Sequence, residues 1–103
     1  MENLLCGKDV ANYIISKSKN KNNIIVDTHL ANDTIVKEFV NTLHNRGYTS
    51  FVYSWEYIYF NIDKKLRDEN IVTNNITWFL NSGCVHRRTL LIGEYTAFEF
   101  SIL

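Results

Sequence analysis

The chain has 103 residues, of which 46% are hydrophobic and 21% charged, so we expect one globular domain spanning residues 1–103. Its formal net charge is zero, which argues against an acidic nucleic-acid mimic and against a nucleic-acid binder driven by bulk charge. No apolar run approaches the roughly 20 residues of a membrane helix, and residues 1–8 lack the pattern of a signal peptide. We therefore expect a cytoplasmic protein that does not bind a membrane.

The first predicted helix covers residues 8–19. Its apolar positions recur at helical spacing and comprise Val10, Ala11, Ile14 and Ile15. A polar loop follows, with Lys17, Lys19 and Lys21 at every second position. Residues 24–26 form a short β-branched run, which predicts a strand buried on both faces. The alternative is that Asp27 or Thr28 already caps the second helix.

The second predicted helix carries one apolar stripe, formed by Ile35, Val36, Phe39, Val40 and Leu43. Asn32 or Asp33 can accept a hydrogen bond from the free amides of its first turn. Arg46 lies in its last turn, where a cation is favourable, and Gly47 is expected to end the helix in the left-handed conformation.

Residues 48–53 and 56–62 are rich in aromatic and β-branched side chains, so we expect a β-hairpin with its turn near Ser54-Trp55. In the second predicted strand, one face would be apolar and would close on the helix stripe. Its residues are Ile58, Phe60 and Ile62. The opposite face would present Tyr57, Tyr59 and Asn61.

Residues 63–70 read as a charged loop or a single helical turn. Residues 71–81 fit a helix or a strand, and we favour a short helix beginning near Thr73. Residues 89–92 and 95–102 predict a second hairpin that turns at Gly93-Glu94. The predicted order is α-β-α-β-β-α-β-β. It indicates an α+β fold with a mixed, mainly antiparallel sheet of about five strands and two or three helices packed on one face.

Two strings suggest enzyme chemistry. Val26-Asp27-Thr28-His29 resembles the start of the metal-binding segment of amidohydrolase-type enzymes, but Ala31 stands where those enzymes have their second histidine, and their barrel exceeds this length. Cys84-Val85-His86 offers two ligands or a nucleophile pair, whereas zinc needs four ligands. We therefore predict no metal, no cofactor and no catalytic residue, and we keep a small enzyme at His29 or at Cys84/His86 as an alternative. Cys6 and Cys84 are expected to be free thiols, with a disulfide as the less favoured alternative.

The basic residues give a second alternative, a small nucleic-acid-binding regulator. Arg87 and Arg88 form the most concentrated basic string. Together with Lys17, Lys19 and Lys21 they could contact phosphates, while Tyr57 and Tyr59 could stack on bases. Solvated loops and tyrosines that pack on each other explain the same residues more simply.

Protein binding is the function that we favour. A tryptophan at a hairpin tip has little structural purpose, and aromatic residues and arginine are the usual anchors of protein interfaces. The predicted partner-binding residues are Trp55, Tyr57, Tyr59, Arg87 and Arg88.

The segment Leu43-His44-Asn45-Arg46-Gly47-Tyr48, followed by an aromatic hairpin, resembles a pattern in small accessory proteins of tailed phages, in which a helix ends in Gly-Tyr and leads into two short strands. The resemblance covers about a third of the chain and stops after Asp63. It implies a phage-encoded inhibitor of a host defence nuclease, similar to anti-CRISPR proteins, that acts in the host cytoplasm by covering a surface. The partner would be a larger host protein or ribonucleoprotein. A homodimer is also plausible, because the terminal strand at residues 98–102 could lie at an open sheet edge.

Overall fold

The computed structural model describes residues 6–18, 24–61 and 69–103. In chain order, the elements are α1 (Gly7–Lys17), β1 (Ile25–Val26), α2 (Asp33–Asn45), β2 (Ser50–Tyr53), α3 (Trp55–Asn61), α4 (Glu69–Asn81), β3 (Cys84–Ile92) and β4 (Tyr95–Ile102). The predicted α+β class is confirmed. The described residues form four helices and four strands instead of two or three helices and about five strands, because residues 55–61 are the helix α3. None of the helices in these described ranges has both the length and the apolar character needed to cross a lipid bilayer.

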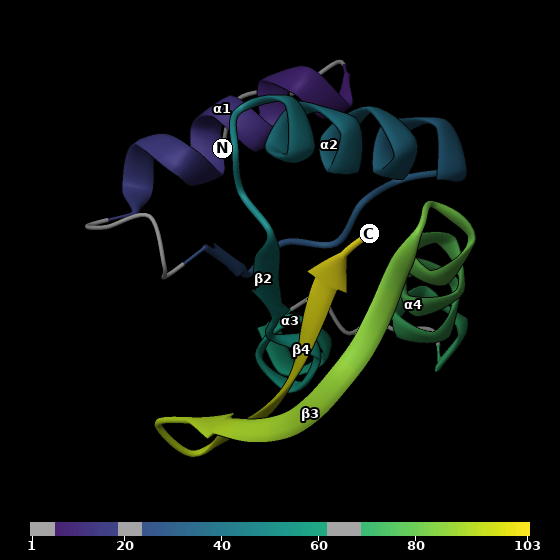
Figure 1. Ribbon diagram of the computed structural model, residues 1–103. Coiled ribbons are helices and arrows are strands. Elements are labelled where there is room, and N and C mark those ends of the chain that lie inside the picture. Colours follow the sequence, from purple (N-terminus) through teal and green to yellow (C-terminus); the bar gives the residue numbers. More distant parts are fainter. Residues whose placement is uncertain (1–5, 19–23, 62–68) are drawn as a thin grey trace.

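The described strands form one four-stranded mixed sheet in the order β1-β2-β4-β3 (Figure 1). β1 pairs parallel with β2, and the β2–β4 and β4–β3 pairs are antiparallel. The expectation that residues 98–102 lie at an open edge is wrong, because β4 lies between β2 and β3. The expectation that residues 24–26 are buried on both faces is also wrong: Ile24 and Val26 are buried, whereas Ile25 is 37% exposed, as befits an edge strand with one face toward the core.

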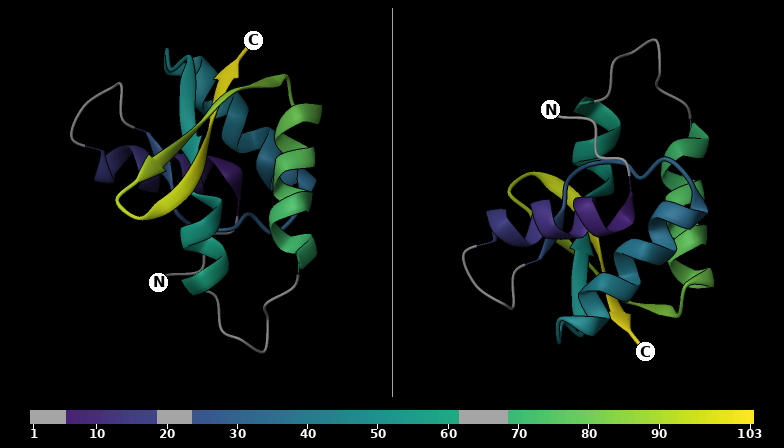
Figure 2. Two further views of the ribbon diagram at one scale, coloured as in Figure 1. Left: turned by 90° about the horizontal axis from the view of Figure 1, so that it is seen from below. Right: turned by 90° about the horizontal axis from the view of Figure 1, so that it is seen from above.

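One face of the sheet carries the core. Aromatic rings from α2, β2, α4 and β4 meet there: Phe39 lies edge-on to Phe51, with ring centroids 5.8 Å apart, and Phe79 packs on Phe51 at 4.9 Å and on Phe100 at 5.3 Å. The rings of Phe39, Phe51, Phe79 and Phe100 are buried almost completely. α2 and α4 therefore cover this face, and α1 packs along α2 (Figure 2).

The ends of α2 are set by local sequence signals, as predicted. The Asn32 side chain accepts a hydrogen bond from the Ile35 amide at 2.9 Å. Gly47 has φ of 86°, its amide donates to the His44 carbonyl at 3.0 Å, and the Tyr48 amide donates to the Leu43 carbonyl at 3.0 Å. This pair of bonds is a Schellman motif, which satisfies the last helical carbonyls and turns the chain into β2.

α3 replaces the second strand of the predicted first hairpin. Aromatic residues favour strands only when a pleated, half-buried surface is available to them, and here the chain turns into a helix directly after β2. The Ser54 carbonyl accepts from the Ile58 amide at 3.1 Å, while the buried Ser54 donates its own amide to Val26 of β1 at 2.9 Å. The predicted alternation consequently fails: Ile58 is buried, but Phe60 is 55% exposed.

Glu56 joins α3 to the part of β4 that extends past the end of β2. The Thr96 amide points away from β3 and donates to the Glu56 carboxylate at 3.1 Å. Continuing the β2–β4 register past Tyr53 and Phe98 would place a backbone carbonyl of β2 in this region. The carboxylate therefore stands in for the acceptor that a longer β2 would have supplied.

We expect Glu56→Ala to cost about 1–2 kcal/mol of unfolding free energy, because it leaves the Thr96 amide of β4 without its charged acceptor. Urea denaturation would measure the loss, and hydrogen exchange should show faster exchange at Thr96. Glu56→Gln keeps an acceptor oxygen and should cost less, while Asn41→Ala at an exposed position of α2 serves as control. A Gln variant as unstable as the Ala variant would contradict this role.

The second predicted hairpin is confirmed. Gly93 has φ of 61°, and glycine at the first position of the two-residue turn between Ile92 and Tyr95 is typical of type II′ geometry. β3 begins at Cys84, so Arg87 and Arg88 lie in a strand rather than in the expected loop. The favoured helix within residues 71–81 is also confirmed, as α4, but it begins at Glu69 instead of near Thr73.

A buried asparagine fixes the loop between β1 and α2. Asn75 of α4 is 1% exposed. Its Oδ1 accepts from the Leu30 amide at 2.8 Å and from the Tyr53 hydroxyl at 3.1 Å, and its Nδ2 donates to the Leu30 carbonyl at 2.8 Å. Burial raises the pKa of Tyr53 well above its ordinary value, which keeps the hydroxyl available as a donor. Asn75 thus ties the loop to the core without leaving a buried polar group unpaired.

Candidate partner-binding surface

The three aromatic residues predicted to bind a partner lie on α3, not on a hairpin. Trp55 is half-buried and stacks on Phe98 of β4 with ring centroids 5.9 Å apart. It is therefore part of the packing between α3 and the sheet rather than a free residue at a hairpin tip. Tyr59 is half-buried and lies edge-on to the exposed Phe60, at 5.2 Å.

Tyr57 is the most accessible of the three. It is 39% exposed and lies edge-on to Tyr95 of β4, with ring centroids 5.5 Å apart. Tyr95 and Glu99 are four residues apart on β4 and so share one face of the sheet. Its contact with Tyr95 therefore places Tyr57 next to the sheet face on which Glu99 lies.

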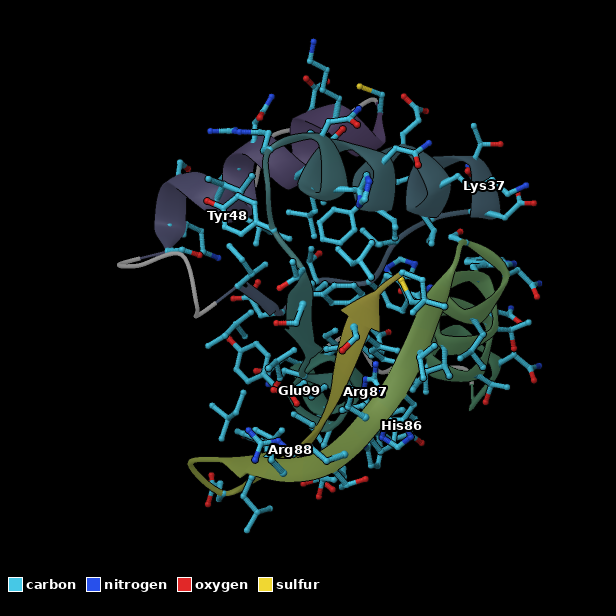
Figure 3. The ribbon with its side chains drawn as sticks, in the orientation of Figure 1. Lys37, Tyr48, His86, Arg87, Arg88 and Glu99 are labelled. Carbon is cyan, nitrogen blue, oxygen red and sulfur yellow. The ribbon has the colours of Figure 1, made fainter. Side chains whose placement is uncertain are left out.

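Arg87 and Arg88 lie on that same face, which α2 and α4 do not cover (Figure 3). Two neighbouring residues of a regular strand point to opposite faces, but the β3–β4 register shifts between His86 and Arg88. This bulge turns both guanidinium groups to one side. Arg87 Nε donates to Ser101 Oγ at 2.9 Å, and Arg88 donates to both carboxylate oxygens of Glu99, at 3.1 and 3.4 Å.

Each arginine is held by its neighbour on β4 and remains accessible. The Arg88 side chain is 69% exposed, against 26% for Glu99. An ion pair so exposed to solvent adds little to stability. It does hold the Arg88 side chain in fewer conformations, so that less conformational entropy is lost on binding. We call the group formed by Arg87, Arg88, Glu99, Tyr95 and Tyr57 the open-face cluster.

The basic residues of the nucleic-acid alternative do not form one patch in the described part of the chain. Lys17 pairs with Asp27 at 3.1 Å and lies over the Tyr13 ring at 4.9 Å, next to β1. Arg87 and Arg88 are on β3, three strand spacings away, or roughly 14 Å. Lys19 and Lys21 lie outside the described residues. Glu99 further reduces the positive charge at Arg88.

Cys84 and His86, the residues of one enzyme alternative, both pack against the core side of the sheet. Cys84 faces the core, and burial raises the pKa of its thiol to about 12, so the reactive thiolate is scarce near neutral pH. The His86 ring packs on Phe98 and Phe100 at 4.9 and 5.7 Å. Cys6 and Cys84 are both free thiols, and within residues 6–18, 24–61 and 69–103 no three His, Cys, Asp or Glu side chains are placed to hold a metal ion.

His29 borders a shallow hollow of about 90 Å³ between the β1–α2 loop and α4, whose other lining residues are Leu30, Ala31, Asn74, Asn75 and Trp78. Partial burial lowers the pKa of His29, which favours the neutral imidazole near pH 7. Since Asn75 uses its hydrogen-bonding atoms on Leu30 and Tyr53, the hollow offers few groups that could orient a substrate.

Sequence reasoning named Tyr57, Arg87 and Arg88 but missed Tyr95 and Glu99. The alternation in β4 was visible, and it could have placed Tyr95 and Glu99 on one face. That the adjacent Arg87 and Arg88 share this face depends on the bulge, which the sequence of β3 does not reveal. Searches against protein-family models, curated protein sequences and solved structures find no match to this chain.

Proposed function

We propose that this chain is a non-catalytic protein-binding module that covers a surface of a larger partner with its open-face cluster. The observation that carries the proposal is the pair Arg87 and Arg88, which the β-bulge turns to the face of the sheet that α2 and α4 do not cover. Arginine and tyrosine are among the residues that contribute most to the affinity of protein interfaces. The cluster brings both types together across β3, β4 and α3.

The arrangement suits a partner surface that carries carboxylates or backbone carbonyls. Arg87 uses Nε on Ser101, and Arg88 uses Nε and one terminal nitrogen on Glu99. The terminal nitrogens of Arg87 and one of Arg88 remain to bond acceptors on a partner, in the planar geometry that a guanidinium presents. Tyr57 and Tyr95 add apolar contact area further along the same face, because Tyr95 is four residues, or about 13 Å, from Glu99 on β4.

The more specific form of the proposal is a phage-encoded inhibitor of a host defence nuclease of the CRISPR type. Its support is the resemblance of Leu43–Tyr48 to the helix ends of phage accessory proteins, and the helix does end at Gly47. The two short strands implied after it are one strand, β2, and one helix, α3, so the resemblance is narrower than the sequence indicated. Nuclease activity measured with and without the purified chain would test inhibition directly.

The binding surface is tested with a pair of charge-matched double variants. Once a partner has been identified by pull-down from the native host, Arg87→Ala/Arg88→Ala should weaken its affinity about tenfold or more by calorimetry. Lys8→Ala/Lys37→Ala removes the same two positive charges from exposed positions on α1 and α2 and should leave the affinity within about twofold. Both variants should unfold at wild-type urea concentrations. Equal loss of affinity in the two double variants would refute the surface.

The two alternatives give different results in simple assays. A nucleic-acid-binding regulator would shift DNA or RNA in a gel at low salt and lose that shift at high salt, because phosphate contacts release counterions. An enzyme centred on His29 or on Cys84/His86 would lose turnover in single His→Ala variants. The separation of Lys17 from Arg87 and Arg88 and the core position of Cys84 make both less well supported than protein binding.

A further inference from the structure

β3 is an edge strand of the sheet, and no described residue pairs with its outer side. Its backbone atoms at that edge can be identified from the register. The Thr96 amide donates to Glu56, away from β3, and Thr96 lies opposite Leu91. In an antiparallel pair the two opposite residues either exchange both hydrogen bonds or neither. The amide and carbonyl of Leu91 therefore point outward from the sheet.

The amide and carbonyl of Thr89 also point outward from the sheet. The Val52 and Ser54 amides donate to Ile24 and Val26 of β1, so Tyr53 between them directs its backbone groups to Phe98 of β4. Phe98 is thus bonded on the β2 side, and its opposite residue on the other side, Thr89, directs its groups outward. Within residues 89–92, the outer edge of β3 accordingly offers two amides and two carbonyls, at Thr89 and Leu91.

The two halves of this edge differ. Natural proteins protect an open edge with bulges and charged residues, and the first half of β3 has both, at Arg87 and Arg88. The second half, Leu90-Leu91-Ile92, has neither. Leu91 is 69% exposed, and it belongs to the part of the hairpin that extends past β2 as a projecting arm (Figure 1). The open backbone groups and the exposed leucine coincide on this arm.

We propose that a second copy of this chain pairs with this arm, through antiparallel pairing of β3 with the β3 of its partner about a two-fold axis at Leu91. In this register each Leu91 lies opposite its own counterpart and Leu90 lies opposite Ile92, while Arg88 lies just past the paired segment, near the partner's turn, which carries Glu94. The charge pattern argues against a two-fold axis at Arg87 or Arg88, which would place arginines directly opposite each other. An axis at Thr89 would place Arg88 opposite Leu90, whereas an axis at Leu91 keeps both arginines outside the paired segment. The register argument uses Arg87 and Arg88 of the open-face cluster, but the proposal does not depend on what that cluster binds.

Cysteine cross-linking tests both the dimer and its register, in a Cys6→Ser background that keeps the buried Cys84. An axis at Leu91 places the two Leu91 Cα atoms about 5.5 Å apart, within the range of a disulfide. Leu91→Cys should form a covalent dimer under mild oxidation. Thr89→Cys should not, because the two Thr89 positions are offset by four residues, or about 13 Å. Leu80→Cys, at an exposed site on α4, controls for random collision.

Sedimentation equilibrium of the unmodified chain gives the second arm of the test. The apparent mass should rise from 12.1 kDa toward twice that value as concentration increases, and Leu91→Lys should abolish the rise while Leu80→Lys preserves it. A monomer at every concentration, or equal cross-linking at residues 80 and 91, would overturn the proposal. Cross-linking at residue 89 instead of residue 91 would overturn the register.

Discussion

Asn75→Ala should lower the free energy of unfolding by about 4 kcal/mol, the largest loss we expect from a single polar substitution. The change leaves the Leu30 amide, the Leu30 carbonyl and the Tyr53 hydroxyl buried without a partner, and each such group costs roughly 1–3 kcal/mol. Because small domains are stable by only about 5–15 kcal/mol, the variant should be close to unfolding at 37 °C. Urea denaturation followed by tryptophan fluorescence would measure this.

The neighbouring Asn74 provides a matched control, since it is exposed on the same helix and Asn74→Ala should change stability by less than about 0.5 kcal/mol. A double-mutant cycle separates the network from simple loss of volume. Tyr53→Phe should cost about 1 kcal/mol alone and less in the Asn75→Ala background, where the hydroxyl already lacks its acceptor. Additive effects of the two changes would show that Asn75 does not act through Tyr53.

Gly7→Ala should destabilise the protein by about 2–3 kcal/mol, which corresponds to a fall in melting temperature of roughly 10–20 °C. Gly7 begins α1 where that helix crosses α2, and it is buried. A Cβ at this position would lie 2.5 Å from the Phe39 backbone nitrogen, 2.6 Å from Glu38 Cβ, and closer still to the Ile35 carbonyl oxygen. Since two of these atoms belong to the backbone of α2, the helices must move apart to admit the methyl group.

Gly47→Ala is the informative comparison, because its cost comes from the backbone conformation of residue 47 and not from a steric clash. Gly47 has φ of 86°, and a Cβ there would meet nothing within 4 Å. The left-handed conformation costs a non-glycine residue about 1–2 kcal/mol. In Gly7→Ala the greater helix propensity of alanine partly offsets the clash, yet Gly7→Ala should remain the more harmful of the two. Thermal melts in which Gly47→Ala is the less stable variant would contradict the close approach of α1 and α2.

Together these variants describe how the candidate surface is supported. α2, α4 and Asn75 stabilise the core face of the sheet. The open-face cluster lies on the opposite face, which α2 and α4 do not cover. The open-face cluster and the projecting β3–β4 arm therefore lie on a framework whose stability depends on other residues. Substitutions at Arg87, Arg88 and Leu91 can be interpreted as binding effects for this reason.

The sequence by itself determined the elements whose signals are local. Asn32 and Gly47 bound α2, the apolar spacing through Phe39 and Leu43 gives its buried face, and Gly93 turns the β3–β4 hairpin. α4 was ambiguous but was correctly favoured as a helix. In each case the deciding interaction joins residues a few positions apart, so that the amino-acid types alone specify it.

Only the tertiary structure decided the rest. Residues 55–61 have the composition of a strand, yet they form α3, because Ser54 ends the pairing with β1 and Glu56 satisfies the β4 edge from a helix. The central position of β4, the position of β3 at one edge of the sheet and the close crossing at Gly7 all depend on segments that are distant in sequence. The shared face of Arg87 and Arg88 depends on the register between β3 and β4. Pairing between distant strands is fixed by packing and hydrogen bonding across the whole domain, and neither is encoded within a single stretch of the chain.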